Sequence, residues 1–171
     1  MKLLTIIQAR YSSSRFPGKV LKKYKKKTLL EILIKRLQKS KFVKKIVVAT
    51  SINPSNKEIK NLCKKLNIDC YRGSETDIVD RYYKVAKLFK SKNIIRVTGD
   101  CPLIDSKIID DVAEKFFTSK ADYASNTMPP TFPDGLDVEI FNFKSLEQAW
   151  KNSRKNKRFL EHVTTYIRES A

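Results

Sequence analysis

The chain has 171 residues, 41% of them hydrophobic, which suits a single folded domain with a hydrophobic core. Its 36 Lys and Arg against 18 Asp and Glu give a formal net charge of +18, a balance typical of proteins that bind anions. Three cysteines without a CxxC pair and one histidine exclude a disulfide framework and a Cys/His zinc site. No apolar run approaches the roughly 20 residues that span a bilayer, so we expect a soluble, cytoplasmic protein without a membrane partner.

The positive charge is mostly lysine and is spread along the chain. Lysines occur in nearly every segment of helical periodicity and in the run at residues 22–27. The stems of such side chains commonly cover apolar surface, whereas a face that binds nucleic acid interleaves its cations with exposed aromatic residues. We therefore expect no nucleic-acid partner, and we attribute the charge to surface lysines and to the attraction of a small polyanionic substrate.

Six short apolar runs have the length of β-strands and alternate with segments of helical periodicity. Such alternation predicts an α/β fold in which a mostly parallel sheet lies between two helical layers, with right-handed crossovers. No repeat or linker divides the chain, so residues 1–171 are expected to form one domain. The predicted strands are residues 3–8, 45–50, 69–71, 93–98, 122–125 and 136–142.

Five helices are predicted between and after these strands, each preceded by a capping signal. The third is expected to span residues 76–89, with Tyr82 and Tyr83 packed in the core rather than stacked on a base. Arg81 in this helix is interpreted as part of an ordinary helical charge pattern. The predicted caps of the other four helices are Thr28, Ser55, Asp105 and Ser145.

The first predicted strand runs directly into a loop rich in cations and hydroxyl groups, IIQARYSSSRFPGK at residues 6–19. Arg10, Arg15 and Lys19 can pair with phosphate oxygens, and the serines at 12–14 can donate hydrogen bonds to them. Ligands of an open α/β sheet bind beyond the carboxyl ends of its strands, where this loop is expected. The spacing matches neither the Walker motif nor GxGxxG. The pattern predicts an anion-binding loop, with a solvated basic loop as the alternative.

Two further polar clusters are expected at the same edge of the sheet. Gly99 and Asp100 directly follow the fourth predicted strand. Glycine lets the backbone approach a ligand closely, and a carboxylate is a hard oxygen ligand that suits Mg²⁺. Asp137 and Glu139 alternate in the last predicted strand, so both are expected on one face, where Asp137 would complete a metal site with Asp100. The alternative for each aspartate is a turn or a helix cap.

Two other features leave alternatives open. Arg72, Gly73 and Ser74 precede the third helix, where backbone N–H groups suit an acceptor such as a base carbonyl or a carboxylate. The alternative is a simple helix cap made by Ser74 with Asp77. His162 is the single histidine, and a single histidine is more commonly a structural hydrogen-bond partner than a catalyst.

Six segments in chain order carry a family resemblance: IIQARYSSSRFPGKVL, IVVATS, YRGSETDIVDRYY, RVTGDCPLID, FPDGLDVEIF and EHVTTYI. Together they resemble the spore-coat-polysaccharide cytidylyltransferase-like family, which is related to acylneuraminate and 3-deoxy-manno-octulosonate cytidylyltransferases. The resemblance covers nearly the whole chain. It implies a Rossmann-like nucleotidyltransferase fold, similar to the GT-A glycosyltransferase sheet. The chain stops soon after EHVTTYIR, where relatives commonly continue, so we expect a C-terminal part to be missing.

The resemblance also implies an activity, the Mg²⁺-dependent transfer of CMP from CTP to a sugar or sugar acid for surface polysaccharide biosynthesis. Arg15, Lys19 and Asp100 are then the expected catalytic residues, and Asp100 and Asp137 the expected Mg²⁺ ligands. The expected sugar-binding residues are Asp134, Asp137, Glu139 and His162. The expected nucleotide-binding residues are Gln8, Ala9, Arg10, Ser12, Ser14, Arg15, Lys19, Arg72, Gly73, Ser74 and Thr98.

The hypothesis is therefore in-line attack of a sugar hydroxyl on the α-phosphorus of CTP, with release of pyrophosphate. Three alternatives remain: a GT-A-type glycosyltransferase that releases a nucleotide, an inactive nucleotide-sugar-binding relative, and a basic nucleic-acid-binding module. A homodimer is a further expectation that the residues leave open.

Overall fold

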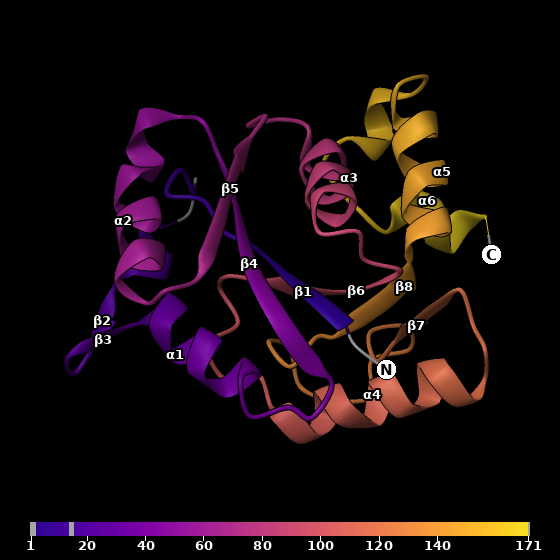
Figure 1. The fold of residues 1–171 in the computed structure, drawn as a ribbon, viewed down its shortest axis with the longest axis horizontal. Helices are drawn as coiled ribbons and strands as arrows, with labels where there is room; N and C mark the ends of the chain where they lie inside the picture. Colours follow the sequence, from indigo (N-terminus) through magenta and orange to yellow (C-terminus); the bar gives the residue numbers. More distant parts are fainter. Residues whose placement is uncertain (1–2, 14–15, 171) are drawn as a thin grey trace.

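A six-stranded sheet in the order β5-β4-β1-β6-β8-β7 forms the centre of the computed structural model, which describes residues 3–13 and 16–170 (Figure 1). β1 pairs in parallel with β4 and β6, and β4 in parallel with β5, whereas β8 is antiparallel to both β6 and β7. The predicted mostly parallel sheet is confirmed. The strands are β1 (Leu3–Gln8), β4 (Val43–Ser51), β5 (Asp69–Gly73), β6 (Asn93–Thr98), β7 (Tyr123–Ser125) and β8 (Glu139–Asn142), with a separate hairpin of β2 (Lys23–Tyr24) and β3 (Lys27–Thr28).

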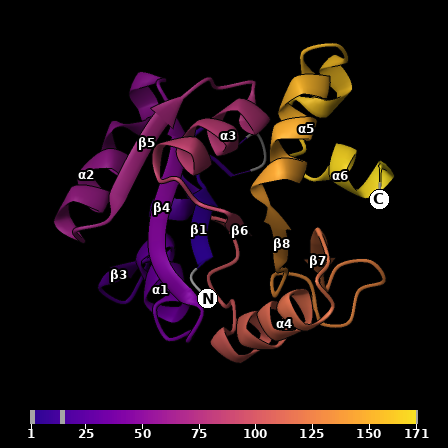
Figure 2. The same ribbon diagram turned by 45° about the vertical axis from the view of Figure 1, so that its right-hand side comes forward.

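Helices cover both faces of the sheet, which gives the predicted three layers. Buried side chains of α1, α2 and α4 pack with one face of the sheet, and those of α3, α5 and α6 pack with the other. Figure 2 shows α5 and α6 apart from α4, with β8 leading into α5. The helices are α1 (Leu29–Leu37), α2 (Lys57–Lys65), α3 (Ile78–Leu88), α4 (Ser106–Thr118), α5 (Phe143–Ser153) and α6 (Thr165–Glu169), with short 3₁₀ turns η1 (Lys19–Leu21), η2 (Pro54–Asn56) and η3 (Lys157–Phe159).

Two of the four predicted caps are confirmed and two are wrong. Thr28 accepts a hydrogen bond from the backbone N–H of Glu31, and Asp105 accepts one from that of Lys107. Ser55 lies inside η2, where the side chain of Asn53 accepts from its backbone N–H. Ser145 lies inside α5, because Asn142 caps this helix three residues earlier than predicted. In both cases an upstream asparagine provides the acceptor, a role for which asparagine is well suited.

The predicted strands 3–8 and 93–98 have the bounds of β1 and β6, but the predicted strand 136–142 is too long. Its first residues form a loop that the side chain of Asn126 holds, because Asn126 donates to the carbonyl of Leu136 at 2.9 Å and accepts from the N–H of Val138 at 2.8 Å. These groups are therefore satisfied without a neighbouring strand. Tyr82 and Tyr83 are buried in the core, as predicted.

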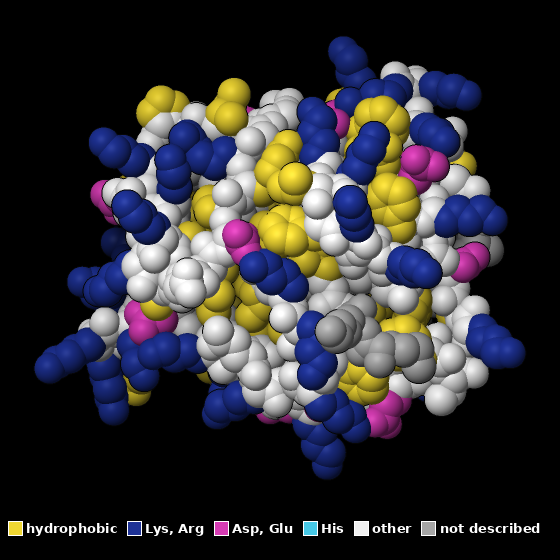
Figure 3. All heavy atoms as spheres, viewed as in Figure 1, with side chains coloured by type: hydrophobic (Ala, Val, Ile, Leu, Met, Phe, Trp, Pro, Cys, Tyr) yellow, Lys and Arg dark blue, Asp and Glu magenta, His cyan; other side chains and the backbone are white. Residues whose placement is uncertain are grey.

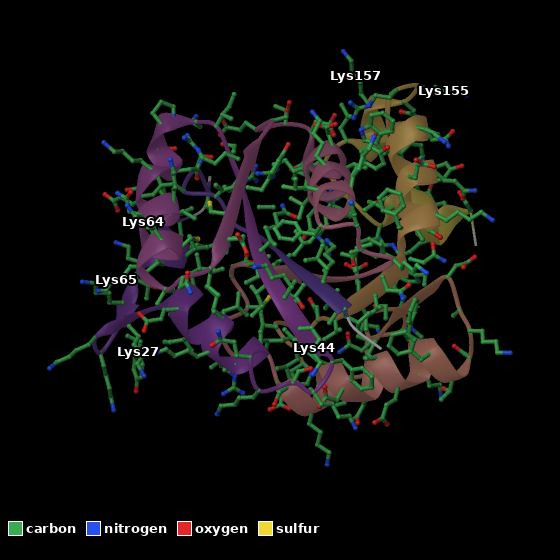
Figure 4. The ribbon with its side chains drawn as sticks, in the orientation of Figure 1. Lys27, Lys44, Lys64, Lys65, Lys155 and Lys157 are labelled. Carbon is green, nitrogen blue, oxygen red and sulfur yellow. The ribbon has the colours of Figure 1, made fainter. Side chains whose placement is uncertain are left out.

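Lysine and arginine are dispersed over the surface. Figure 3 shows them around one whole face of the molecule, with apolar and neutral areas between them. Among the described residues, six exposed lysines without an ion-pair partner point outward from four different elements and from the segment before η3 (Figure 4). That the protein has no nucleic-acid partner stays a prediction. The six outward-pointing lysines are Lys27, Lys44, Lys64, Lys65, Lys155 and Lys157.

Across residues 3–13 and 16–170, none of the helices has the length and apolar character needed to cross a bilayer.

Candidate active site

A cleft of about 310 Å³ opens at the carboxyl ends of the adjacent parallel strands β1 and β6. This is the edge at which an open α/β sheet binds its ligands. Six residues predicted to bind nucleotide or to act in catalysis line it together. They are Gln8, Ala9, Arg10, Lys19, Thr98 and Asp100.

The strand ends that form the floor of the cleft approach each other closely at Gly99. The N–H of Gly99 donates to the carbonyl of Gln8 at 2.8 Å. A Cβ atom at Gly99 would lie 2.9 Å from this same carbonyl oxygen and 3.1 Å from the Cβ of Ala9. Glycine is therefore required here by close backbone contact, which brings Asp100 against the loop that follows β1.

Lys19 and Asp100 form an ion pair across the cleft, between the start of η1 and the end of β6. Burial opposes ionisation of Asp100, but the hydrogen bond and the charge of Lys19 outweigh it, so the pKa of Asp100 lies below its ordinary value. The side chains are 26% and 40% exposed respectively, so both charges are accessible to a ligand in the cleft. The pair thus places one accessible cation beside one accessible carboxylate in the cleft.

The loop after β1 is held in place by Asn56, a buried residue at the end of η2 that the sequence analysis did not single out. Its Oδ1 accepts from the backbone N–H of Tyr11 at 2.8 Å, and its Nδ2 donates to Ser51 Oγ at 2.7 Å. The carbonyl of Tyr11 in turn accepts from the N–H groups of Ser13 and Gly18, both at 2.8 Å. These bonds position the described part of the loop between β1 and β4.

Ser12 points toward the turn between β5 and α3. Its Oγ donates to Glu75 Oε1 at 2.9 Å, and Asn53 Nδ2 donates to Glu75 Oε2 at 2.8 Å. These two hydrogen bonds hold the pKa of Glu75 below its ordinary value. Glu75 therefore joins the anion loop to the β5–α3 turn, a role that its sequence context does not reveal. Ser14 and Arg15 lie outside the described residues, so their predicted roles stay predictions.

The predicted trio does not line the cleft, and two of its members, Arg72 and Gly73, are the last residues of β5 rather than residues after the strand. The guanidinium of Arg72 donates to the carbonyls of Ser51 at 3.3 Å and Ile52 at 2.6 Å, and so supports the turn that carries Asn53. Ser74 Oγ accepts from the N–H of Asp77 at 3.1 Å, which is the cap considered as the alternative. The turn is nevertheless connected to the loop after β1, because Glu75 in the turn accepts a hydrogen bond from Ser12 in that loop.

A second recess of about 200 Å³ adjoins the cleft and shares Arg96, Thr98 and His162 with it. Three of the four predicted sugar-binding residues line this recess: Asp137, Glu139 and His162. Arg168, from α6, adds an exposed cation that the sequence analysis missed. The recess is therefore large enough and polar enough for part of a hydrophilic substrate next to the cleft.

The charge of Glu139 is already compensated within the protein. Glu139 forms an ion pair with Arg96 across the β6–β8 ladder and accepts from the hydroxyl of Tyr123 at 2.8 Å. Burial would raise the pKa of Glu139, but the charge of Arg96 together with the hydrogen bonds from Thr164, Tyr123 and Arg96 lowers it below its ordinary value. Its hydrogen bonds thus give Glu139 a structural role at the edge of the recess.

Asp134 and Asp137 place further negative charge near Asp100. Burial, followed by the charges of Asp134 and Glu139, raises the pKa of Asp137 above its ordinary value. Asp134 itself is exposed and lines a separate apolar hollow, together with Asp100 and Leu103. In the part of the chain that the structure describes, no three His, Cys, Asp or Glu side chains gather as a complete metal-ligand set. Mg²⁺ commonly needs only one or two carboxylates beside substrate phosphates. Asp100 lines the cleft and Asp137 lines the adjoining recess, so these are the carboxylates on hand for such an ion.

Comparison with known proteins decides the family. A sequence model of the family described as cytidylyltransferase matches residues 4–171. The chain belongs to the cytidylyltransferase family. It is accordingly a nucleotidyltransferase, as the motifs predicted.

Individual relatives agree with this placement. An uncharacterized protein of Methanocaldococcus jannaschii, MJ1063, is 43% identical over 99% of this chain and 68% of its own length. The spore coat polysaccharide biosynthesis protein SpsF of Bacillus subtilis is 36% identical over 97% of this chain and 70% of its length. The 3-deoxy-manno-octulosonate cytidylyltransferase of Solibacter usitatus is 32% identical, but over 64% of this chain and 42% of its own length.

A solved structure gives the same fold. The cytidylyltransferase of Leptospira borgpetersenii superposes with a TM-score of 0.92 at 36% identity, over 99% of this chain and 71% of the other. The predicted nucleotidyltransferase fold is confirmed. This chain spans about 70% of the length of its full-length relatives.

Proposed function

We propose that this protein is a Mg²⁺-dependent cytidylyltransferase that transfers CMP from CTP to a sugar or sugar acid in the synthesis of a surface polysaccharide. The observation that carries the proposal is the Lys19–Asp100 pair in a cleft at the carboxyl ends of β1 and β6. The names of the SpsF and 3-deoxy-manno-octulosonate relatives support the choice of CTP, of a sugar acid and of a polysaccharide pathway.

The reaction needs positioning and charge neutralisation more than covalent chemistry. A hydroxyl of the sugar attacks the α-phosphorus of CTP and loses its proton to water, the bond between the α-phosphorus and the bridging oxygen breaks, and pyrophosphate leaves. Arg10 and Lys19 offset the charge of the triphosphate and of the departing pyrophosphate. The second recess, with Asp137 and His162, holds the acceptor sugar beside the cleft.

A magnesium ion would be held by Asp100, with Asp137 as the second carboxylate. When bound, it supplies positive charge to the phosphate oxygens. Asp100 is suited to this role because the pKa of its carboxyl group is low and the group is ionised at neutral pH. Lys19 is then free to move from Asp100 to a phosphate oxygen as the ligand enters.

Ligand-induced stabilisation tests the binding part of this proposal. At a CTP concentration about 100 times Kd, binding stabilises the folded state by about 2.7 kcal/mol, which is roughly 5–11 °C in Tm for a chain of this size. We expect this shift with CTP and Mg²⁺, a smaller shift without Mg²⁺, and loss of most of it in Lys19→Met. Lys65→Met removes an exposed lysine on α2 and is the matched control, with an unchanged shift. No response of the wild-type protein to any nucleoside triphosphate would contradict the proposal.

A further inference from the structure

Arg81 is a fully buried cation whose guanidinium has no hydrogen-bond partner among the described residues. It lies in the first turns of α3 and is 1% exposed. Within the described part of the chain, none of the three nitrogen atoms of its guanidinium donates a hydrogen bond. Burial lowers the pKa of Arg81, although an arginine stays charged in a protein. An unpaired buried charge is costly to the fold, so this guanidinium needs acceptors that residues 3–13 and 16–170 do not provide.

The position of Arg81 is set by Gly73 at the end of β5. A Cβ atom at Gly73 would lie 2.8 Å from Cγ of Arg81 and 2.9 Å from the ring of Tyr71. The absence of a side chain at Gly73 therefore lets the stem of Arg81 cross the end of the strand. This packing holds the guanidinium in one place before any ligand arrives, which lowers the cost of binding.

This place lies directly behind the wall of the cleft. Arg81 is close enough to Arg10 and to Glu75 for their charges to act on it. Arg10 lines the cleft, and Glu75 is tied to the first loop by Ser12. Arg81 therefore lies near Arg10 in the loop after β1 and near Glu75 in the β5–α3 turn, without lining the cleft itself.

A second buried polar atom without a partner belongs to the same region. The side-chain oxygen of Gln8 is buried and accepts no hydrogen bond from the described residues, although Gln8 lines the cleft. Leu4 and Ile6 precede Gln8 on the same face of β1 and pack in the core shared with α3. By the alternation of a strand, Gln8 also faces the α3 side, where Arg81 lies.

The two side chains offer complementary hydrogen-bonding groups. Arg81 offers only donors, in a planar fork, and the Gln8 oxygen is an acceptor. The edge of cytosine has two adjacent acceptors, O2 and N3, followed by a donor, the 4-amino group. Uracil instead has a donor at N3 and an acceptor at position 4. Two donors beside one acceptor thus match cytosine and mismatch uracil.

We propose that Arg81, together with Gln8, forms the base-selecting site of this protein, in which the guanidinium donates to O2 and N3 of cytosine and Gln8 accepts from its 4-amino group. The inference rests on the proposed function and adds the residues that choose the nucleotide. Because Arg81 is 1% exposed, the base reaches it when the hydrogen bond between Ser12 and Glu75, which lies at the surface, opens.

Arg81→Met separates this role from a structural one. Methionine keeps the apolar stem against Tyr71 and removes the unpaired charge, so the ligand-free variant is expected to melt several degrees above the wild type. Its affinity for CTP is expected to fall about 5- to 150-fold, the value of a bidentate contact to a base. Its preference for CTP over UTP falls to the part that Gln8 provides, whereas its affinity for inorganic triphosphate stays unchanged.

The matched control is Arg36→Met. Arg36 lies on α1 and its Nε donates to the carbonyl of Ile104 at 2.6 Å, on the opposite face of the sheet. This variant is expected to melt below the wild type and to keep the nucleotide preference. Gln8→Met is compared on CTP and on the analogous triphosphate of pyrimidin-2-one, which keeps O2 and N3 but lacks the 4-amino group. This variant is expected to bind the two nucleotides with equal affinity, because it has no acceptor for the 4-amino group.

The outcomes distinguish the two proposals. If the wild type binds no nucleoside triphosphate, the proposed function fails, and this inference fails with it. If the wild type prefers CTP and Arg81→Met keeps that preference in full, the inference alone is overturned. It is also overturned if Arg81→Met melts below the wild type and loses affinity for CTP, UTP and inorganic triphosphate equally, because Arg81 would then support the fold or the phosphates.

Discussion

The ion pair between Arg96 and Glu139 provides a stability prediction whose size follows from the structure. Glu139 is 4% exposed, stands directly opposite Arg96 in the β6–β8 ladder and also accepts from Tyr123. Glu139→Gln keeps the shape of the side chain but removes its charge. Arg96 would then be a largely buried cation without a counter-charge, and its Nε already lacks a partner among the described residues.

Removal of one partner from a buried ion pair costs about 3–5 kcal/mol. The Arg96 side chain is 19% exposed, so water relieves part of this cost and the lower end, about 3 kcal/mol, applies. For a chain of 171 residues this corresponds to a fall in Tm of roughly 6–12 °C at pH 7. Glu114→Gln removes one partner of the exposed Lys41–Glu114 pair and should leave Tm almost unchanged.

The same variant has a predicted pH dependence. The pKa of Glu139 is lowered in the folded state, because the Arg96 charge and the hydrogen bonds that the carboxylate accepts together outweigh burial. The stabilisation from its carboxylate is therefore complete above the unfolded pKa, about 4.3, and is lost as pH falls through the lower folded value. Thermal denaturation followed by circular dichroism should show the gap in Tm between wild type and Glu139→Gln at pH 7 and its reduction below pH 4. A variant that melts with the wild type at pH 7 would refute the reasoning.

Two further predictions concern the loop after β1 and the strand ends beneath it. Asn56→Ala leaves the N–H of Tyr11 without its partner, so it should lower the free energy of unfolding by about 1–3 kcal/mol and weaken CTP binding. Urea denaturation measures the first effect and titration calorimetry the second. An unchanged Kd would show that Asn56 does not position the loop. Gly99→Ala places a Cβ 2.9 Å from the carbonyl oxygen of Gln8, so it should destabilise the fold by about 1–3 kcal/mol and reduce nucleotide affinity. A variant with a normal Tm, whose crystal structure keeps the β1–β6 register, would contradict this.

Features encoded by local pattern were predictable from the sequence. The apolar runs at residues 3–8 and 93–98 have the bounds of β1 and β6, because these central strands are buried on both faces and lack polar alternation. Gln8, Ala9, Arg10 and Lys19 of the first motif meet Thr98, Gly99 and Asp100 of the second in one cleft, because parallel strands bring their carboxyl ends to one edge.

Features that depend on contacts between distant segments were not predictable. Arg81 was interpreted as part of a surface charge pattern, because the sequence does not show that Gly73 leaves room for it beneath the end of β5. Glu75 and Asn56 act through hydrogen bonds to residues more than 40 positions away, to Ser12 and Tyr11 respectively. The start of β8 was misplaced because Asn126, and no neighbouring strand, binds the backbone before it.

Pyrophosphate release tests the central claim most directly. The assay uses the purified chain with Mg²⁺, each nucleoside triphosphate in turn and a panel of sugar acids, in the wild type and in Asp100→Asn. The variant keeps the shape of an exposed side chain, so it should fold normally. We predict release with CTP and at least one sugar acid by the wild type, and a loss of orders of magnitude in Asp100→Asn, because its carboxylate holds the ion that neutralises the phosphates. Near-normal release by Asp100→Asn, or none by the wild type with any nucleotide, would contradict the account.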